Sequence, residues 1–165
     1  MRHAKSSWKL EGLDDHSRPL NARGRRSAEC VATELQERNW SPDAVLSSDA
    51  HRTRETWKKM RPVFPETETT FTRDLYLAGV DSVVLALSEV GRAEGCLLTL
   101  GHNPGWSSFV HHVSGHFVEL KTGDAALLTA RHEGDWVDLL TLPRQWELVD
   151  VIRSRPLFEA SRQEN

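Results

Sequence analysis

The sequence predicts an α/β domain with a largely parallel sheet, and three observations support this fold class. Segments typical of strands alternate along the chain with segments typical of helices. The clearest apolar runs are short, as in buried strands, and each is followed by a helical pattern. The 165 residues include 38% hydrophobic and 27% charged residues, which is ordinary for a globular protein. We therefore expect one domain over residues 1–165 with one core.

The first half of the chain predicts two helices on either side of a buried strand. Asn21 is a good N-cap for a helix that reaches Arg38, with apolar residues at helical spacing along one face. Ala44-Val45-Leu46 indicates a strand that ends at Ser47-Ser48. A second helix is expected from His51 to just before Pro62, because proline lacks an amide donor and restricts the residue before it.

The middle of the chain predicts a helix, a strand and another helix. Asp81 or Ser82 is expected to cap the first of these helices. Cys96–Leu100 is the clearest strand and leads into a Gly-His-Asn-Pro-Gly turn. Pro104 suits the first turn of a helix that continues to about Val113.

The C-terminal part predicts a hairpin and a tail. Ala126–Ala130 and Trp136–Leu142 flank His132-Glu133-Gly134-Asp135, a pattern typical of an antiparallel hairpin with its turn at Glu133-Gly134-Asp135. The residues from about Arg153 onward are polar, and we expect them to be loosely ordered.

Composition excludes several classes of function. No apolar run is long enough to cross a bilayer, and the N-terminus has no signal-peptide pattern, so we expect a cytoplasmic protein without a membrane partner. The two cysteines, Cys30 and Cys96, form no CxxC pair and are expected to be buried thiols. A net charge of -3 gives no reason to expect a nucleic-acid partner.

Polar residues gather where predicted strands end. They form three clusters, Arg2-His3, the Ser47 to Arg52 segment and Gly101-His102-Asn103. In open parallel α/β sheets this edge is where ligands usually bind. We therefore expect His3, His102, Arg2 and Arg52 to face one pocket. Arginine offers forked donors to phosphate oxygens, and histidine serves as a nucleophile or donor near neutral pH, so the set suits a phosphoryl group.

Four segments stand out when the chain is taken in order. They are Arg2-His3-Ala4-Lys5-Ser6, Arg18-Pro19-Leu20-Asn21-Ala22-Arg23-Gly24, Ser47-Ser48-Asp49-Ala50-His51-Arg52-Thr53-Arg54-Glu55-Thr56 and Leu100-Gly101-His102-Asn103-Pro104-Gly105. These segments resemble motifs of the histidine phosphatase superfamily in its SixA branch, and the resemblance extends from residue 1 to about residue 142. One motif alone would be weak, whereas four in the right order are specific.

The resemblance implies a fold and a reaction. The fold would be a three-layer α/β/α sandwich, similar to phosphoglycerate mutase, in a minimal form without large helical insertions. His3 would attack phosphorus and be phosphorylated transiently, while Arg2, Arg52 and His102 hold the phosphoryl oxygens. Arg18 and Asn103 are further candidates for substrate binding. The scheme needs no metal and no cofactor, and the implied partner is a protein carrying phosphohistidine or a small phosphorylated substrate.

Neutral His3 is a requirement of this chemistry. We expect the positive charges of Arg2 and Arg52 to favour the neutral imidazole. No general acid stands where the larger relatives have theirs, and Asp15 and Asp49 are the candidates for a proton role.

One departure from the family keeps alternatives open. The family places apolar residues before Arg-His as the first strand of the sheet, whereas Met1 directly precedes Arg2 here. Either the chain starts further upstream or this strand is nearly absent. A catalytically impaired phosphate-binding regulatory module is therefore one alternative, and a phosphatase of small metabolite phosphoesters is another.

His111, His112 and His116 lack a carboxylate or cysteine that would complete a metal site, and we expect them to be surface histidines.

Overall fold

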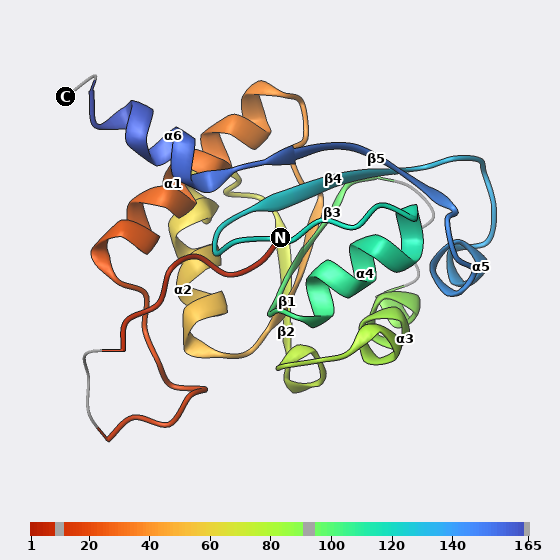
Figure 1. Ribbon diagram of the computed structural model, residues 1–165, viewed down its shortest axis with the longest axis horizontal. Helices are drawn as coiled ribbons and strands as arrows, with labels where there is room; N and C mark the ends of the chain where they lie inside the picture. The colour runs from red at the N-terminus through yellow and green to blue at the C-terminus, as the bar shows by residue number, and fades with distance from the viewer. Residues whose placement is uncertain (9–11, 91–94, 164–165) are drawn as a thin grey trace.

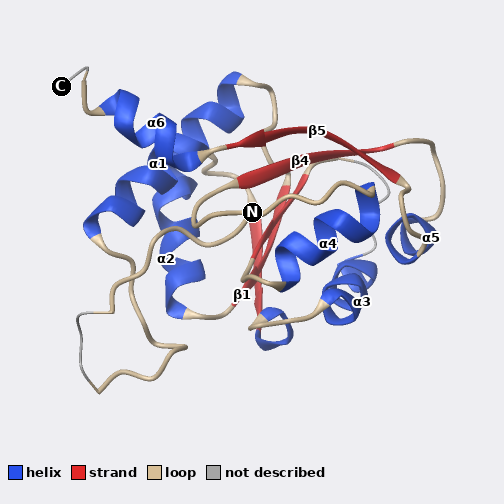
Figure 2. Ribbon diagram, in the orientation of Figure 1, coloured by secondary structure: helices blue, strands red, loops and turns tan. Residues whose placement is uncertain are grey.

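The computed structural model describes residues 1–8, 12–90 and 95–163. Its strands form a middle layer between two groups of helices (Figures 1 and 2). On one side lie α1 (Ala22–Glu37), α2 (His51–Met60) and α6 (Ser154–Ser161), and on the other α3 (Val80–Val90), α4 (Gly105–Ser114) and α5 (Trp136–Thr141). Short 3-10 turns cover Arg61–Val63 and Arg73–Leu75. Within the described ranges, no helix is both long and apolar enough to cross a membrane.

The strands form two separate pieces of sheet. β1 (Ala44–Ser48) is the centre of a parallel three-stranded piece, between β2 (Glu68–Thr72) and β3 (Leu97–Leu100). β4 (Ala125–Ala130) and β5 (Trp146–Ile152) form an antiparallel pair. Among the described residues, only an isolated parallel bridge between Arg2 and Gly101 continues the sheet beyond β3. The N-terminus therefore lies between β3 and β4 (Figure 1).

Apolar side chains fill both faces of the middle layer. Val31 and Leu35 of α1, with Trp57 of α2, pack in one cluster with Leu98 and Leu100 of β3. A second cluster contains Leu46 of β1 and apolar residues of α3 and α4, Val83, Leu87, Trp106, Phe109, Val110 and Val113. Because both faces of the sheet are covered at β1 and β3, these two strands carry apolar residues on both sides, as in other α/β proteins.

The structure confirms most of the predicted elements. α1, β1, α2, β3 and α4 lie within a residue or two of their predicted bounds, and the Asn21 side chain accepts a hydrogen bond from Gly24 N at 2.8 Å as the N-cap of α1. α3 begins at Val80, earlier than a cap at Asp81 or Ser82 would allow. β2 was not predicted, because its sequence Glu-Thr-Thr-Phe-Thr is polar and exposed on one side, which suits the edge of a sheet.

The predicted hairpin is wrong in its second half. Trp136–Thr141 is the helix α5, and the strand that pairs with β4 is β5, with Ala130 opposite Trp146. Asp135 is an N-cap that accepts a hydrogen bond from Val137 N at 2.8 Å, rather than a turn residue. The buried residues of α5 are Leu139 and Leu140, three and four positions after Trp136, which is helical spacing.

The expectation of a loose C-terminal tail is also wrong for the described residues. Ser154–Ser161 form α6, whose partly buried Leu157 packs against the core beside α1. Ser154 begins this helix with its amide bonded to Asp124 Oδ1 at 3.0 Å, and Asp124 also accepts from Arg153 Nη1 at 2.7 Å. A buried carboxylate therefore anchors the segment, and local composition gave no sign of it.

Candidate active site

The N-terminal residues are held at the edge of the sheet where β1 and β3 end. His3 N donates to Gly101 O at 3.0 Å, just beyond β3, and Arg2 N donates to Asp124 O at 3.0 Å, just before β4. Ala4 N donates to Thr56 Oγ1 at 3.0 Å, which ties the segment to α2. These bonds bring the first motif, the Ser47–Thr56 stretch and the second histidine motif to one place.

Gly101 is required at this junction by close packing. A Cβ atom built on Gly101 would lie 2.1 Å from Cη2 of Trp106, far inside van der Waals contact. The buried Trp106 ring therefore occupies the space beneath the turn. Trp106 thus supports the turn from below.

His3 has one ring nitrogen bound, and its other ring nitrogen has no hydrogen-bond partner among the described residues. Its side chain is only 7% exposed, and Nδ1 lies 2.7 Å from the Ala4 carbonyl oxygen. Because a carbonyl oxygen can only accept, Nδ1 carries the proton in the neutral ring and Nε2 holds the lone pair. This arrangement matches the requirement for a nucleophilic imidazole.

The protonation state of His3 is set first by burial. Desolvation lowers the pKa of His3 to about 3, the Ala4 carbonyl opposes this, and the charges of Arg52, Arg2 and Arg18 lower it further. From the sequence, we expected the charges of the arginines to keep His3 neutral. They contribute in the expected direction, but burial has the larger effect on this pKa.

His102 faces His3 with a ring-centroid separation of 5.2 Å. Its Nδ1 accepts from Arg52 Nη2 at 3.2 Å, so its proton is on Nε2, which donates to Ser48 Oγ at 2.9 Å. Burial lowers the pKa of His102 to about 2, with His3 and Arg52 adding to the effect. His102 is thus a neutral ring beside His3, with both nitrogens bound to protein groups.

Arg52 is the most buried cation at the site, with 3% of its surface exposed. Besides His102, its guanidinium donates to the carbonyl oxygen of Asp15 and, from Nη2, to Asp15 Oδ2 at 2.9 Å. A buried guanidinium held by a carboxylate and a neutral imidazole has a fixed orientation.

Arg2 is partly exposed and keeps a donor without a protein partner. Its Nη1 donates to Leu120 O at 2.9 Å, whereas its Nε is buried without a partner among the described residues. A buried unpaired donor costs free energy, and an oxyanion is a suitable partner for it.

Arg18 joins the site, while Asn103 is occupied elsewhere. Arg18 is buried, donates to Asp15 Oδ1 at 2.6 Å and to Ser6 Oγ, and lies 3.2 Å from the centre of the exposed Trp8 ring. Asn103 Nδ2 donates to Leu120 O at 2.8 Å, and its Oδ1 accepts from Ser107 Oγ at 3.1 Å. The amide of Asn103 therefore braces the turn before α4.

Asp15 and Tyr76 complete a network around the cations. The Tyr76 hydroxyl donates to Asp15 Oδ2 at 2.7 Å, and its ring stands edge-on to His102 at 5.4 Å between centroids. Hydrogen bonds from Tyr76 and the cations Arg52 and Arg18 outweigh desolvation and lower the pKa of Asp15 to about 2. Desolvation and then Asp15 raise the pKa of Tyr76. Sequence reasoning did not find Tyr76, which lies outside the quoted motifs. Ser48 lies inside one of them, but its contact with His102 was not predicted.

Asp49, the other candidate for a proton role, is placed differently. Its carboxylate pairs with His16 Nε2 at 2.7 Å, whereas Asp15 is the carboxylate that binds Arg52. His112 Nε2 lies 3.2 Å from the carbonyl oxygens of Leu140 and Thr141. Within the described part of the chain, no group of three or more His, Cys, Asp or Glu side chains could hold a metal ion.

Comparison with known sequences identifies the family. A family model for the histidine phosphatase superfamily (branch 1) matches residues 1–75. An uncharacterized chloroplastic protein of Arabidopsis thaliana is 35% identical over 164 residues, which cover 92% of this chain and 75% of that protein. An uncharacterized protein of Mycobacterium tuberculosis is 30% identical over 148 residues, covering 84% of this chain and 91% of that protein.

Solved structures show the same fold. A protein from Agrobacterium tumefaciens, named as a candidate phosphohistidine phosphatase SixA, superposes with a TM-score of 0.76 at 25% identity, covering 93% of this chain and 94% of that one. The protein histidine phosphatase SixA bound to tungstate gives a TM-score of 0.76 at 18% identity, covering 95% of this chain and 96% of that one. The architecture is the phosphoglycerate mutase-like fold of SixA, without large insertions in the described residues. By its sequence relatives and its fold, this chain belongs to the histidine phosphatase superfamily.

Proposed function

We propose that the protein is a phosphohistidine phosphatase that works through a phosphohistidine intermediate on His3. The observation that carries this proposal is the state of the His3 ring, which is neutral, bound to Ala4 O through Nδ1 and, in the described part of the chain, without a partner at Nε2. Its neighbours are three arginines and a second neutral histidine. Such a site suits in-line attack on a phosphoryl group.

The reaction divides into two displacements. His3 Nε2 forms a bond to phosphorus while the bond from phosphorus to the substrate nitrogen breaks, and the leaving imidazole takes up a proton from solvent water. The phosphorylated His3 ring then carries a positive charge, which the Nδ1–H bond to Ala4 O stabilises. Water next attacks phosphorus, loses a proton to solvent and releases orthophosphate, which regenerates neutral His3.

The arginines of the site are placed to bind the phosphoryl oxygens. Arg52 is fixed by Asp15 and His102, and the buried Nε of Arg2 is a donor for an oxyanion. Arg18 approaches from the loop that also carries Asp15. Donors fixed before the reaction stabilise developing charge without having to reorganise. Asp15, with its lowered pKa, positions two of these cations and stays ionised near neutral pH.

The surroundings of the site favour a protein substrate. Trp8, which stacks on Arg18, is 75% exposed, and Leu77, which follows Tyr76, is 57% exposed. Exposed aromatic and aliphatic side chains beside a charged centre are typical of protein contact surfaces.

We place the enzyme in the cytoplasm, in keeping with its two free cysteines, Cys30 and Cys96. The mechanism assigns no step to a metal ion.

The test compares phosphate release from a phosphohistidine peptide and from p-nitrophenyl phosphate. His3→Ala should abolish release of phosphate from the peptide, whereas His132→Ala, at an exposed histidine far along the chain, should leave it unchanged. Wild-type protein quenched during turnover should carry an acid-labile, alkali-stable phosphoryl group that His3→Ala lacks.

Other results would point to the other functions. Equal rates for wild type and His3→Ala would remove the nucleophile. Turnover of p-nitrophenyl phosphate and small phosphoesters alone would indicate a metabolite phosphatase. Protection from heat by vanadate or tungstate, without turnover or labelling, would indicate a phosphate-binding module.

A further inference from the structure

A second histidine–carboxylate pair lies beside the candidate active site, and no step of the proposed reaction uses it. His16 Nε2 and Asp49 Oδ1 are 2.7 Å apart, and their side chains are only 25% and 24% exposed. Arg73 is the weaker partner of Asp49, because its Nη1 is 3.9 Å from the same oxygen and its side chain is 62% exposed. A partly buried pair is screened less by water and salt than an exposed one, so the His16–Asp49 pair can hold two segments together.

His16 directly follows Asp15, the carboxylate that orients the cations of the site. Asp15 accepts from Arg52 Nη2 at 2.9 Å and from Arg18 Nη1 at 2.6 Å, although its side chain is 42% exposed. It stands on a turn of residues 15–17, which we call the Asp15 turn and which belongs to no helix or strand. The orientation of Arg52 therefore depends on what holds this turn in place.

The Asp15 turn is fastened to the start of α2. His51 N, the first amide of this helix, donates to His16 O at 2.9 Å. Ala50 precedes the helix and has no side chain that could cap it, so the carbonyl of His16 takes the place of a cap for this amide. Asp49 comes directly before Ala50, and its own amide donates to Thr72 O at 3.0 Å at the end of β2. The backbone bond and the His16–Asp49 pair thus tie the turn to the same part of the fold.

The ring of His16 is also held from a second side. It stands edge-on to the Tyr76 ring, with 4.9 Å between the centroids and 80° between the planes. Tyr76 in turn donates to Asp15 Oδ2 at 2.7 Å and stands edge-on to His102. His16 therefore joins the hydrogen-bonded network of the site to Asp49.

We propose that His16 is a positioning residue of the phosphoryl site, which acts by holding the Asp15 turn on α2 through its bond to Asp49. With the turn in place, one carboxylate reaches both Arg52 and Arg18. With the turn released, Arg52 loses its fixed orientation towards a phosphoryl oxygen. This role rests on the proposed function, because it concerns the same site.

The experiment measures tungstate affinity and amide hydrogen exchange in variants of the complete chain. His16→Ala and Asp49→Ala each remove the bond from one side, so either variant tests the pair if the other fails to fold. His16→Gln keeps a donor, because the amide nitrogen of glutamine is as many bonds from the backbone as Nε2 of histidine. Glu159→Gln is the control, because it weakens an exposed ion pair with Arg155 within α6.

Tungstate affinity should fall about ten-fold in His16→Ala and in Asp49→Ala, an effect typical of coupling within one hydrogen-bond network. The double variant should bind no more weakly than either single one, because both changes remove the same bond. Exchange of the His51 amide should become about ten-fold faster in both alanine variants, because the turn that covers it opens more often. His16→Gln and Glu159→Gln should stay within about two-fold of the wild type in both measurements.

A second comparison tests whether His16 acts through Asp15. In an Asp15→Ala protein, His16→Ala should lower tungstate affinity by less than about two-fold, because the carboxylate that it positions is already gone. A further ten-fold loss in that protein would overturn the proposal. So would alanine variants that bind tungstate like the wild type, a His16→Gln variant as weak as His16→Ala, or unchanged exchange of the His51 amide.

Neither measurement needs turnover, so the two proposals can fail separately. A wild type that binds tungstate but hydrolyses no phosphorylated substrate would remove the proposed enzymatic function and keep the role of His16 at the oxyanion site. A wild type that binds no tungstate would overturn both.

Discussion

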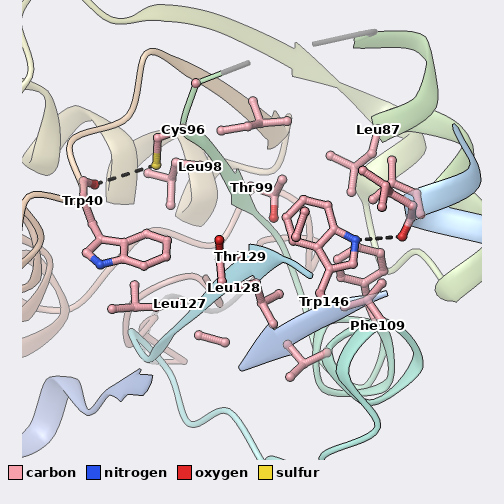
Figure 3. A pocket seen from close by; sticks show the side chains of 18 of the residues that line it. Trp40, Leu87, Cys96, Leu98, Thr99, Phe109, Leu127, Leu128, Thr129 and Trp146 are labelled. Atoms are coloured by element: carbon pink, nitrogen blue, oxygen red, sulfur yellow. Dashed lines mark hydrogen bonds between the residues drawn. The ribbon is translucent and has the colours of Figure 1, made fainter. Parts of the chain in front are cut away.

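The two ends of β3 show how differently one strand is supported along its length. At its C-terminal end, Gly101 packs on Trp106 and bonds to both Met1 and His3, and the site beyond it is dense with polar contacts. At its N-terminal end, the same strand borders a cavity of about 960 Å³ between β3 and β4, the β3–β4 groove (Figure 3). Only a few residues separate the two environments.

The difference shows what holds the nucleophile in place. His3 lacks a long strand ladder in front of it among the described residues, yet its backbone is fixed by Gly101, Asp124 and Thr56 through Ala4. The polar framework at the end of the sheet therefore orients the imidazole. Loss of packing in the groove and loss of polar contacts at the site should then have separable effects.

The largest effect should come from Arg52 at the polar end. Arg52→Lys keeps the charge but cannot bind Asp15 and His102 together, so kcat/KM for a phosphohistidine peptide should fall by about 10²–10³-fold. Arg54→Lys, two residues along the same helix and exposed, is the matched control and should stay near the wild-type rate. If both variants lost activity equally, orientation of Arg52 would not matter.

Adding methyl groups beside the Trp106 ring and beside the β3–β4 groove tests packing directly. Gly101→Ala should cost about 1–3 kcal/mol of unfolding free energy, because its Cβ meets the Trp106 ring. Ala126→Val, which lines the groove, should change stability by less than about 1 kcal/mol, because there is room for the added methyls. Chemical denaturation measures both, and a larger loss for Ala126→Val would mean that the groove is closed in solution.

The pH dependence of stability reports on the buried histidine. The unfolded His3 has a pKa near 6.5 and the folded one a pKa of about 3, so between these values the unfolded state binds a proton that the folded state does not. Stability is therefore complete above about pH 6.5 and falls with decreasing pH, at about 1.4 kcal/mol per pH unit for this residue. His3→Asn should show a shallower slope by one proton. An unchanged slope would mean that His3 is protonated in the folded protein.

The smallest effect is expected at Tyr76. Tyr76→Phe removes the hydrogen bond to Asp15 but keeps the ring against His102, which should cost about 1 kcal/mol or less. We expect kcat to fall several-fold while KM changes little, since Asp15 still holds Arg52. A KM that rises with unchanged kcat would instead place Tyr76 in contact with substrate.

Local sequence was sufficient for elements whose own residues specify them. Asn21 capped α1 as predicted, and the apolar run before Gly101 formed β3. Prediction from local sequence failed where a partner distant in sequence decides the structure. Asp135 could end a strand or cap a helix, and α6 depends on the Asp124 carboxylate, which the composition of the tail does not reveal.

By itself, the sequence determined that His3, His102, Arg2 and Arg52 would converge, because each follows or begins a segment whose strand or helix character is encoded locally. The tertiary structure alone decided that burial keeps both imidazoles neutral, that Asp15, itself bonded to Tyr76, holds Arg52, and that a groove separates β3 from β4. The physical reason is that desolvation, buried hydrogen bonds and packing depend on which distant segments surround a residue.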